Sequence, residues 1–213
     1  MPEPLVLVGG TFDPPHIGHL VLAECARVQL GARFAIFLPA GDPWRKTGSA
    51  PGPERQTGRQ VTPAMQRLQM TRLATRDNAS FRVDDREIRR SGPTYTVDTL
   101  EEFHREGHSN LVLVIGSDAL ADIENWKEPG RIRELARLAI AEKPGSELPS
   151  LPTSETVERI DMPRLAISST EIRARVGAGK PFRYLVPAAV EAYIAEHHLY
   201  RPDAPRPRKH GGE

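Results

Sequence analysis

Short apolar runs alternate with helical patterns along this chain, and the alternation predicts parallel strands separated by helices. The runs that predict strands lie at 5–8, 33–38, 81–88, 111–115, 138–141 and 158–162. Short runs of this kind, rich in aliphatic residues, are typical of buried strands. A strand, a helix and a second strand in succession predict a βαβ unit with a right-handed crossover. We therefore expect an α/β fold with a parallel sheet, whose ligands bind beyond the carboxyl ends of the strands.

Two of these runs indicate where their strands lie in the sheet. The run at 111–115 is apolar throughout, which predicts a central strand. The run at 81–88 mixes apolar with charged residues, and we expect it to form a strand near a sheet edge. The last run, at 158–162, predicts one further short strand.

Helical patterns fill the intervals between the runs. They are expected over 20–30, from 62, from 94, over 130–136, over 169–177 and from 187. At Thr62-Pro63 a hydroxyl can cap the helix while proline takes the first helical position. Met65, Leu68 and Leu73 are expected on the buried face of that helix.

Three stretches show neither the apolar runs typical of strands nor a helical pattern. Residues 39–60 are rich in glycine, proline and scattered basic residues, and a loop this long in a compact domain is usually functional or disordered. Residues 147–156 form a polar connection, and the segment 201–213 is expected to be a disordered tail. The expected organisation is one domain over 1–200, followed by this tail.

Composition narrows the class of protein without naming a chemistry. The chain has 213 residues, enough for one domain with a real core, and its formal net charge is +1, so no global field favours nucleic acid or a membrane. The lone Cys25 cannot form an internal disulfide. No run is long and apolar enough to span a bilayer, and residues 1–4 lack the basic region of a signal peptide. We expect a cytoplasmic protein, and the composition is compatible with a homo-oligomer.

Candidate chemistry concentrates between the first strand and the first helix, in the string Gly9-Gly10-Thr11-Phe12-Asp13-Pro14-Pro15-His16-Ile17-Gly18-His19. A strand-to-helix turn presents backbone N–H groups and a helix N-terminus, which together bind anions. Gly9 and Gly10 would let a phosphate approach the backbone, and Gly18 would leave room for a bulky ligand. His16 and His19 are three residues apart and so share a face of the first helical turn. The alternative is that both histidines are ordinary surface or capping residues.

This string closely resembles the HxGH signature of the nucleotidylyltransferase superfamily, and in its longer form it is most similar to bacterial nicotinate-mononucleotide adenylyltransferases. The string Ile167-Ser168-Ser169-Thr170-Glu171-Ile172-Arg173 resembles the second signature of the superfamily. Ser168 or Ser169 would cap the helix that Gly177 ends. The resemblance covers about residues 4–200 and is weakest in the 39–60 loop, which it implies to be mobile without ligand and to order over a triphosphate. It implies a Rossmann-like parallel sheet flanked by helices, of the nucleotidylyltransferase type, with a C-terminal helical part at about 167–200.

The resemblance also implies an activity. It is the transfer of an adenylyl group from ATP to nicotinate mononucleotide, giving nicotinate adenine dinucleotide (deamido-NAD) and pyrophosphate, in NAD biosynthesis. The acceptor phosphate would attack the α-phosphorus of ATP directly, helped by positioning and charge stabilisation. His16 and His19 would donate to the α-phosphate, and Lys46 and Arg173 would hold the pyrophosphate. Mg²⁺ would arrive with ATP, since no acidic cluster suggests a metal site of the protein's own.

The same resemblance assigns binding residues. The ATP side would comprise Gly9, Gly10, Thr11, Phe12, His16, Gly18, His19, Gly116, Asp118, Ile167, Ser168, Ser169, Thr170 and Arg173. The acceptor side would comprise Gly10, Thr11, Phe12, Asp13, Lys46, Thr96, Trp126 and Lys127. The backbone near Thr96 would meet the pyridine carboxylate, and Trp126 would stack on the ring.

Local reasoning leaves several alternatives open. Asp118 could only cap the helix that follows it, Trp126 could be a packing anchor, and Arg45 could replace Lys46. Nicotinamide mononucleotide, phosphopantetheine or flavin mononucleotide could be the acceptor on the same fold. A protein of another class, which binds nucleotides without catalysis, could also use this scaffold.

Overall fold

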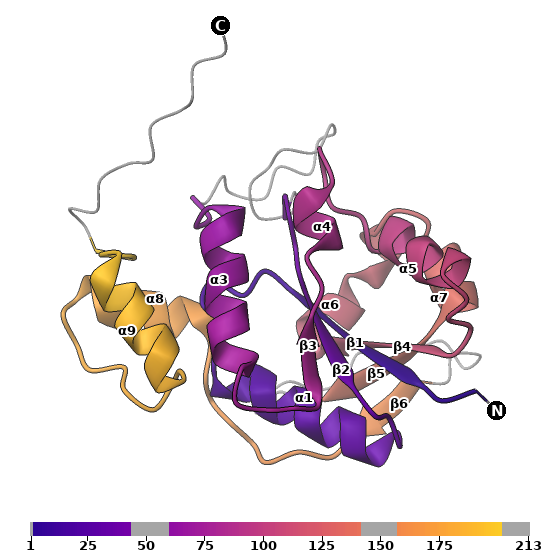
Figure 1. Cartoon of the computed structure of the whole chain (residues 1–213), viewed down its shortest axis with the longest axis horizontal. Helices are drawn as coiled ribbons and strands as arrows, with labels where there is room; N and C mark the ends of the chain where they lie inside the picture. The colour runs from indigo at the N-terminus through magenta and orange to yellow at the C-terminus, as the bar shows by residue number, and fades with distance from the viewer. Residues whose placement is uncertain (1, 44–59, 142–156, 202–213) are drawn as a thin grey trace, which may run out of the picture.

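In the part of the chain that the computed structural model describes, residues 2–43, 60–141 and 157–201, six parallel strands form one sheet (Figure 1). The strands are β1 (Leu5–Gly10), β2 (Ala35–Pro39), β3 (Phe81–Val83), β4 (Leu111–Gly116), β5 (Ala136–Ala141) and β6 (Val157–Ile160). Their order across the sheet is β3-β2-β1-β4-β5-β6. The expected α/β fold with a parallel sheet is therefore confirmed.

Helices connect these strands and cover the sheet. They are α1 (Ile17–Gln29), α3 (Ala64–Thr75), α4 (Arg86–Arg89), α5 (Thr96–Arg105), α6 (Ser117–Ala121), α7 (Pro129–Leu135), α8 (Ser169–Gly177) and α9 (Ala188–Glu196), with a 3₁₀ turn η1 (Ile123–Asn125). No helix among the described residues combines the length and the apolar character needed to cross a membrane.

The two most apolar strands lie at the centre of the sheet. β1 pairs with β4 on one side, with Leu5 opposite Leu111, and with β2 on the other, with Val6 opposite Ala35. Successive side chains of a strand point to opposite faces, so both faces of these central strands need cover. The prediction of a central strand at 111–115 is confirmed.

Each face of the sheet carries its own apolar core. On one face Leu7 and Leu113 pack with α5 and α7, through residues such as Leu100 and Ile132. On the other face Val8 and its neighbours pack with α1. A third cluster joins α3 to α8 and α9, which lie beside the sheet rather than over it (Figure 1). The C-terminal helical part is thus anchored on α3.

The expected strand at 81–88 is wrong in its second half. Only Phe81–Val83 pair with β2, at the edge of the sheet, and α4 then begins at Arg86. The Asp84 carboxylate accepts a hydrogen bond from the backbone N–H of Arg86, at 2.9 Å. Aspartate side chains that bond their own backbone two residues on favour turns over strands, which ends the strand here.

The helix expected from Thr62 is present, with two corrections. Pro63 rather than Thr62 occupies the N-cap, and the helix begins at Ala64. Met65, expected on the buried face, is 64% exposed, whereas Arg67 is only 1% exposed. A buried guanidinium must find hydrogen-bond acceptors inside the protein, and that requirement orients the helix.

Arg67 binds three main-chain carbonyls from three separate segments. Its guanidinium donates to the carbonyl oxygens of Thr11, Gly41 and Thr62, each at 2.8 Å. Thr11 belongs to the loop after β1 and Gly41 to the segment after β2. One side chain therefore holds together the loops that leave two neighbouring strands at the same edge of the sheet.

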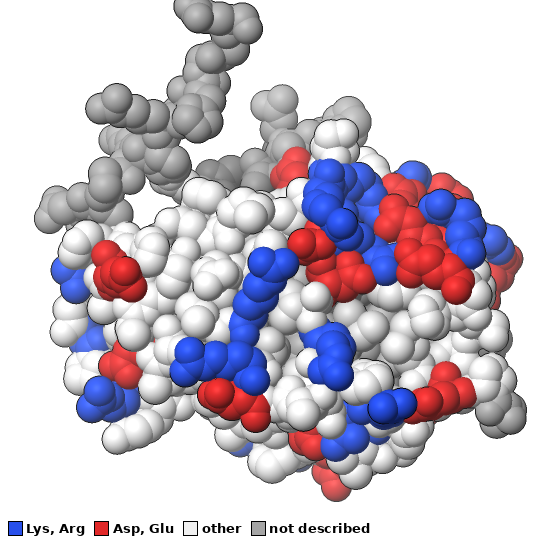
Figure 2. All heavy atoms as spheres, viewed as in Figure 1, with Lys and Arg blue, Asp and Glu red and all other residues white. Residues whose placement is uncertain are grey.

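On the face shown in Figure 2, charged side chains gather most densely over α4, α5 and α7, where acidic and basic groups intermingle. Charged groups over α3 and α9 are more scattered. Arg72, on the same helix as Arg67, is half-exposed and pairs with Asp85 at 3.1 Å. Helix α3 thus carries one buried arginine and one arginine at the surface.

We expect Arg67→Lys to lower the free energy of unfolding by at least about 2 kcal/mol, because one ammonium group cannot reach three carbonyls and a buried unmade hydrogen bond costs roughly 1–3 kcal/mol. Arg72→Lys is the matched control, and a surface ion pair contributes only about 0–1 kcal/mol. Urea titration of both variants measures the difference. Equal losses would show that Arg67 contributes no more than a surface arginine.

Candidate active site

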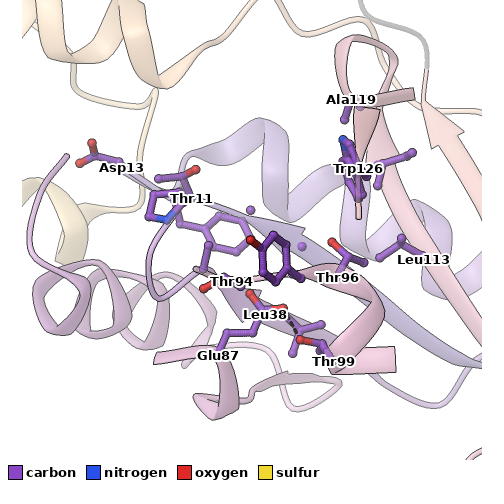
Figure 3. Close-up of a pocket in the computed structure, with 18 of the residues that line it drawn as sticks. Thr11, Asp13, Leu38, Glu87, Thr94, Thr96, Thr99, Leu113, Ala119 and Trp126 are labelled. Carbon is purple, nitrogen blue, oxygen red and sulfur yellow. Dashed lines mark hydrogen bonds between the residues drawn. The ribbon is translucent and has the colours of Figure 1, made fainter. Parts of the chain in front are cut away.

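A cavity of about 630 Å³ lies at the carboxyl edge of the sheet, between the loops after β1, β2 and β4. Its wall includes twelve of the residues expected from the sequence: Gly9, Gly10, Thr11, Phe12, Asp13, His19, Thr96, Gly116, Trp126, Lys127, Ser169 and Arg173. In Figure 3 Thr11 and Asp13 lie at one end, Thr96 and Trp126 lie at the other, and Glu87, Thr94 and Thr99 lie along one side between them. Residues 160 positions apart in the sequence thus share one chamber.

The loop after β1 is packed around Phe12. This residue has a positive φ of 50° and is 2% exposed. A Cβ on Gly10 would stand 2.9 Å from the Phe12 ring, so glycine is needed there by the protein itself. At Gly9, by contrast, a Cβ would meet nothing within 4 Å, so that position is open. Both glycines line the cavity, and their expected contact with a phosphate stays a prediction.

His19 forms part of the cavity wall, and contacts with Phe12 and with the backbone of His16 fix the orientation of its ring. The Phe12 ring meets it edge-on at 5.0 Å, and the backbone N–H of His16 donates to its Nδ1 at 3.1 Å. With Nδ1 accepting, Nε2 is the nitrogen that carries a proton. His19 therefore has its hydrogen-bond donor on the side away from the helix N-terminus.

His16 lies behind His19. The two rings stack with centroids 3.7 Å apart, and His16 is 8% exposed. It occupies the N-cap of α1 rather than the first helical turn, because the helix begins at Ile17. Burial lowers the pKa of His16 to about 4, so this ring is neutral near pH 7.

Gly18 gives the His16 ring room to pack. A Cβ at this position would lie 3.1 Å from His16 Nδ1 and 3.2 Å from its Cε1. The expected contact of Gly18 with a bulky ligand stays a prediction.

The N-terminus of α8 closes the cavity beside the loop after β1. Ser168 is the N-cap, and its hydroxyl accepts from the backbone N–H of Glu171 at 3.1 Å. Ser169 donates to the carbonyl of Pro14, and Arg173 to the carbonyl of Asp13 at 2.7 Å. These contacts bind the second signature to the loop that carries the first.

Thr170 and Ile167 act one step away from the cavity. The hydroxyl of Thr170 accepts from Arg173 Nη2 at 3.0 Å, which fixes the guanidinium. Ile167 packs into the apolar cluster of α3, α8 and α9. Their positions favour support of the second signature over direct contact with a ligand.

The Asp13 side chain is held in place by Tyr200, which follows α9 in the sequence. Its carboxylate accepts a hydrogen bond from the Tyr200 hydroxyl at 2.8 Å, and the residue is 2% exposed. Burial and the nearby Asp13 charge raise the pKa of Tyr200 well above its usual value, so the phenol stays protonated as the donor. The Asp13 carboxylate therefore braces the loop, and this contact could not be read from the sequence.

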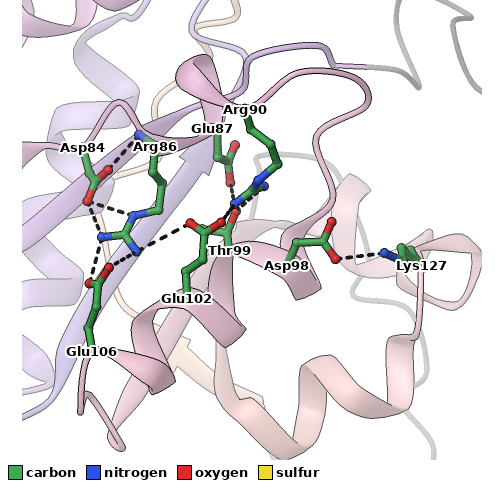
Figure 4. A network of polar contacts seen from close by, with 9 residues as sticks. All are labelled: Asp84, Arg86, Glu87, Arg90, Asp98, Thr99, Glu102, Glu106 and Lys127. Carbon is green, nitrogen blue, oxygen red and sulfur yellow. Dashed lines mark hydrogen bonds and ion pairs between the residues drawn. The ribbon is translucent and has the colours of Figure 1, made fainter.

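The opposite end of the cavity is formed by the start of α5 and the loop after η1. Thr96 opens α5, and its neighbour Tyr95 lies under the Lys127 ammonium, 4.8 Å from the ring centroid. Lys127 also pairs with Asp98 at 2.9 Å, which raises the pKa of Lys127 (Figure 4). The indole N–H of Trp126 is buried and has no hydrogen-bond partner.

Glu87 is a wall residue that sequence reasoning missed. It lies on α4, is 6% exposed and accepts a hydrogen bond from the Thr99 hydroxyl at 2.8 Å (Figure 4). Burial raises the pKa of Glu87 to about 7, although that hydrogen bond and the charge of Arg90 act in the opposite direction. Because the sequence predicts one strand over 81–88, it gives no local signal for a cavity residue on a helix at this position.

Several expected site residues are not tested by this geometry. Lys46 and its alternative Arg45 lie outside the described residues, as do the side chain of Asp118, the 147–156 connection and the tail from 202. Most of the 39–60 segment, expected to order over a triphosphate, also lies outside them. Among the residues that are described, no three His, Cys, Asp or Glu side chains cluster to hold a metal ion.

Comparisons with known proteins agree with this arrangement. A family model described as cytidylyltransferase-like matches residues 7–175. A protein of Roseiflexus sp. (strain RS-1), named probable nicotinate-nucleotide adenylyltransferase, is 44% identical over 207 residues, which cover 93% of this chain and 98% of that protein. The chain belongs to the nicotinate-nucleotide adenylyltransferase family. It is therefore a nucleotidyltransferase by descent.

Other relatives extend the likeness. A protein of Thermomicrobium roseum with the same name is 41% identical over 205 residues, covering 92% of this chain and 91% of that protein. The nicotinic acid mononucleotide adenylyltransferase of Plasmodium falciparum, solved in complex with NaAD, matches with a TM-score of 0.70 over 93% of this chain and 97% of that chain. Since its sequence identity is 19%, this structure shows a shared fold only.

The raised pKa of Glu87 has a consequence for folding. A carboxyl whose pKa is higher when folded than when unfolded contributes stability that is present at low pH and lost as the pH rises through about 7. We therefore expect the stability of Glu87→Gln relative to wild type to rise between pH 5 and pH 8. The gain in unfolding free energy should be about 2 kcal/mol. Denaturant titration at both pH values measures it.

The control for this measurement is Glu101→Gln on α5. Glu101 is half-exposed and pairs with Arg131 at the surface. Its substitution should change stability by a similar small amount at both pH values. If Glu87→Gln behaves like this control, the carboxyl of Glu87 titrates as an exposed group and its burial has no energetic effect.

Proposed function

We propose that this chain transfers the adenylyl group of ATP to nicotinate mononucleotide, which yields nicotinate adenine dinucleotide and pyrophosphate. The observation that carries the proposal is one cavity with two unlike ends. His19, Ser169 and Arg173 line the end suited to a polyphosphate, while Thr96 and Trp126 line the end suited to a flat ring. A reaction between two nucleotides needs both ends in a single chamber.

Chemistry would occur by direct displacement. The 5′-phosphate oxygen of the mononucleotide forms a bond to the α-phosphorus of ATP, and the bond from that phosphorus to the bridging oxygen of pyrophosphate breaks. Since both reactants are anionic, the protein has to position them and stabilise the charge that builds on the α-phosphate. His19 would donate from Nε2, the nitrogen that its backbone contact leaves protonated.

His16 would act at the same phosphate, or through His19 on which it stacks. Arg173 and Lys46 would bind the leaving pyrophosphate, and the free N–H groups at the start of α8 would add to that site. Mg²⁺ would enter as the counterion of ATP, where it neutralises phosphate charge. The described residues hold no acidic cluster to bind it, so phosphate oxygens would be its ligands.

The acceptor ring would lie between Trp126 and the start of α5. Backbone N–H groups near Thr96 and Lys127 are donors, and they suit a ring carboxylate, which only accepts hydrogen bonds. A ring amide would turn its own N–H groups toward one of these donors. The arrangement therefore favours nicotinate over nicotinamide mononucleotide, and it also disfavours phosphopantetheine and flavin acceptors.

The function is tested by incubating the protein with ATP and each acceptor in turn, and by assaying pyrophosphate and the dinucleotide. We expect product with nicotinate mononucleotide. His19→Ala should lower kcat by on the order of 10²–10³, as loss of one preorganised donor typically does. Arg72→Lys, on the surface of α3, is the control and should leave kcat unchanged.

Two results would contradict this proposal. Nucleotide binding without pyrophosphate release, with every acceptor, would favour a binding protein that lacks catalysis. Near-normal turnover by His19→Ala would remove that histidine from the mechanism.

We also expect Trp126→Ala to weaken both mononucleotides alike. Stacking is worth roughly 1–3 kcal/mol per base and does not distinguish two rings of nearly equal size. The wild-type ratio of kcat/KM should favour nicotinate by at least about tenfold, the lower end of the penalty for an unmade buried hydrogen bond, and the variant should keep it. A ratio that collapses in Trp126→Ala would show that the ring contact carries the discrimination.

A further inference from the structure

We propose that Glu87 is a specificity-determining residue, whose carboxyl charge sets the preference of the cavity between an acceptor whose ring carries a carboxylate and one whose ring carries an amide. The inference rests on the proposed function, because it concerns the acceptor end of the same cavity. Glu87 lies on α4, outside both signature strings of the superfamily.

Position is the first support for this role. Glu87 lines the cavity together with Thr94, Tyr95 and Thr99, close to the start of α5 (Figure 3). Thr99, whose hydroxyl donates to Glu87 Oε1, follows Thr96 by three residues on the same helix. Residues three apart share a helix face, so the Glu87 carboxyl lies one helical turn from the proposed carboxylate-binding backbone.

The charges that surround Glu87 come from four segments. Arg90 and Asp84 belong to the same region as α4, Glu102 to α5, and Arg67 to α3, while Asp42 lies after β2 near Arg67. Arg90 is held by Glu102 at 2.6 Å and by the Thr99 hydroxyl at 3.2 Å, and Arg67 is held by its three carbonyls. The hydrogen bonds of both guanidinium groups are thus directed to other partners than Glu87.

Protonation is the second support. Burial raises the pKa of Glu87 to about 7, so the carboxyl is neutral below that pH and negative above it. In both mononucleotides the ribosylated ring nitrogen is positive, so the nicotinate ring with its carboxylate is zwitterionic and the nicotinamide ring is cationic throughout this range. When Glu87 is neutral it repels neither ring, and when Glu87 is ionised it repels the carboxylate, which only the nicotinate ring carries.

The direction in which the substrate preference changes with pH follows from these charges. The ratio of kcat/KM for nicotinate over nicotinamide mononucleotide should fall as the pH rises through about 7. By linkage, the pKa of Glu87 should be higher with the ring carboxylate bound than with the ring amide bound. Two like charges in a partly dehydrated cavity interact strongly enough for an effect on the order of tenfold, which is one unit of pKa.

The experiment measures that ratio between about pH 6 and pH 8.5 for wild type, Glu87→Gln and Glu101→Gln. The pH effects of groups that act equally on both substrates cancel in this ratio. These groups include ATP, the acceptor phosphate and the histidines. Wild type and Glu101→Gln should lose on the order of tenfold in the ratio across this range. Glu87→Gln, which mimics the neutral carboxyl, should keep the low-pH ratio at every pH.

A second measurement needs no variant. The titration of the Glu87 carboxyl, followed by carbon NMR in isotope-labelled wild-type protein, is compared with nicotinate adenine dinucleotide and with nicotinamide adenine dinucleotide bound. The pKa should be higher in the first complex. This comparison decides the proposal even if Glu87→Gln does not fold.

The outcomes separate the two proposals. A wild-type ratio that does not change with pH, or a Glu87→Gln ratio that changes as in wild type, overturns the role of Glu87 and leaves the function standing. Equal Glu87 pKa values in the two complexes do the same. If neither mononucleotide yields a dinucleotide at any pH, the proposed function is wrong, and the role of Glu87 is rejected with it.

Discussion

The loops at the carboxyl edge of a parallel sheet have no neighbouring strand to bind their backbone, so something else must hold them in place. Here a single buried guanidinium does so. Arg67 donates to the carbonyls of Thr11 and Gly41, which follow adjacent strands, and to that of Thr62 before its own helix. Because a buried charge is tolerated only where its hydrogen bonds are made, the helix, the loops and the guanidinium constrain one another. The shape of the cavity depends on that mutual constraint.

Burial acts on two ionisable groups at the cavity in opposite ways. It lowers the pKa of His16 to about 4 and raises that of Glu87 to about 7, so each group is shifted toward its neutral form. His16, which has no charge near pH 7, can stack closely on His19 without repulsion.

Much of the site could be predicted from the sequence because its residues lie in two short strings with their own local signals. The glycines, histidines and serines occur in strand-to-helix turns, where periodicity and capping chemistry agree. What escaped prediction depends on tertiary contacts. Nothing local distinguishes Arg67 from Arg72, yet one is buried and the other half-exposed. Glu87 was hidden by the assignment of 81–88 to one strand, and the fit of Gly10 against Phe12 required coordinates.

The contact between Tyr200 and Asp13 joins positions 187 residues apart, and Arg173 reaches the same loop across 160 residues. Ribosomes make proteins from the N-terminus, so the loop after β1 emerges first and its braces emerge last. A nascent chain can form the central βαβ unit long before it has Tyr200 to complete the loop. The loop after β1 therefore reaches its braced form only when synthesis has passed Tyr200.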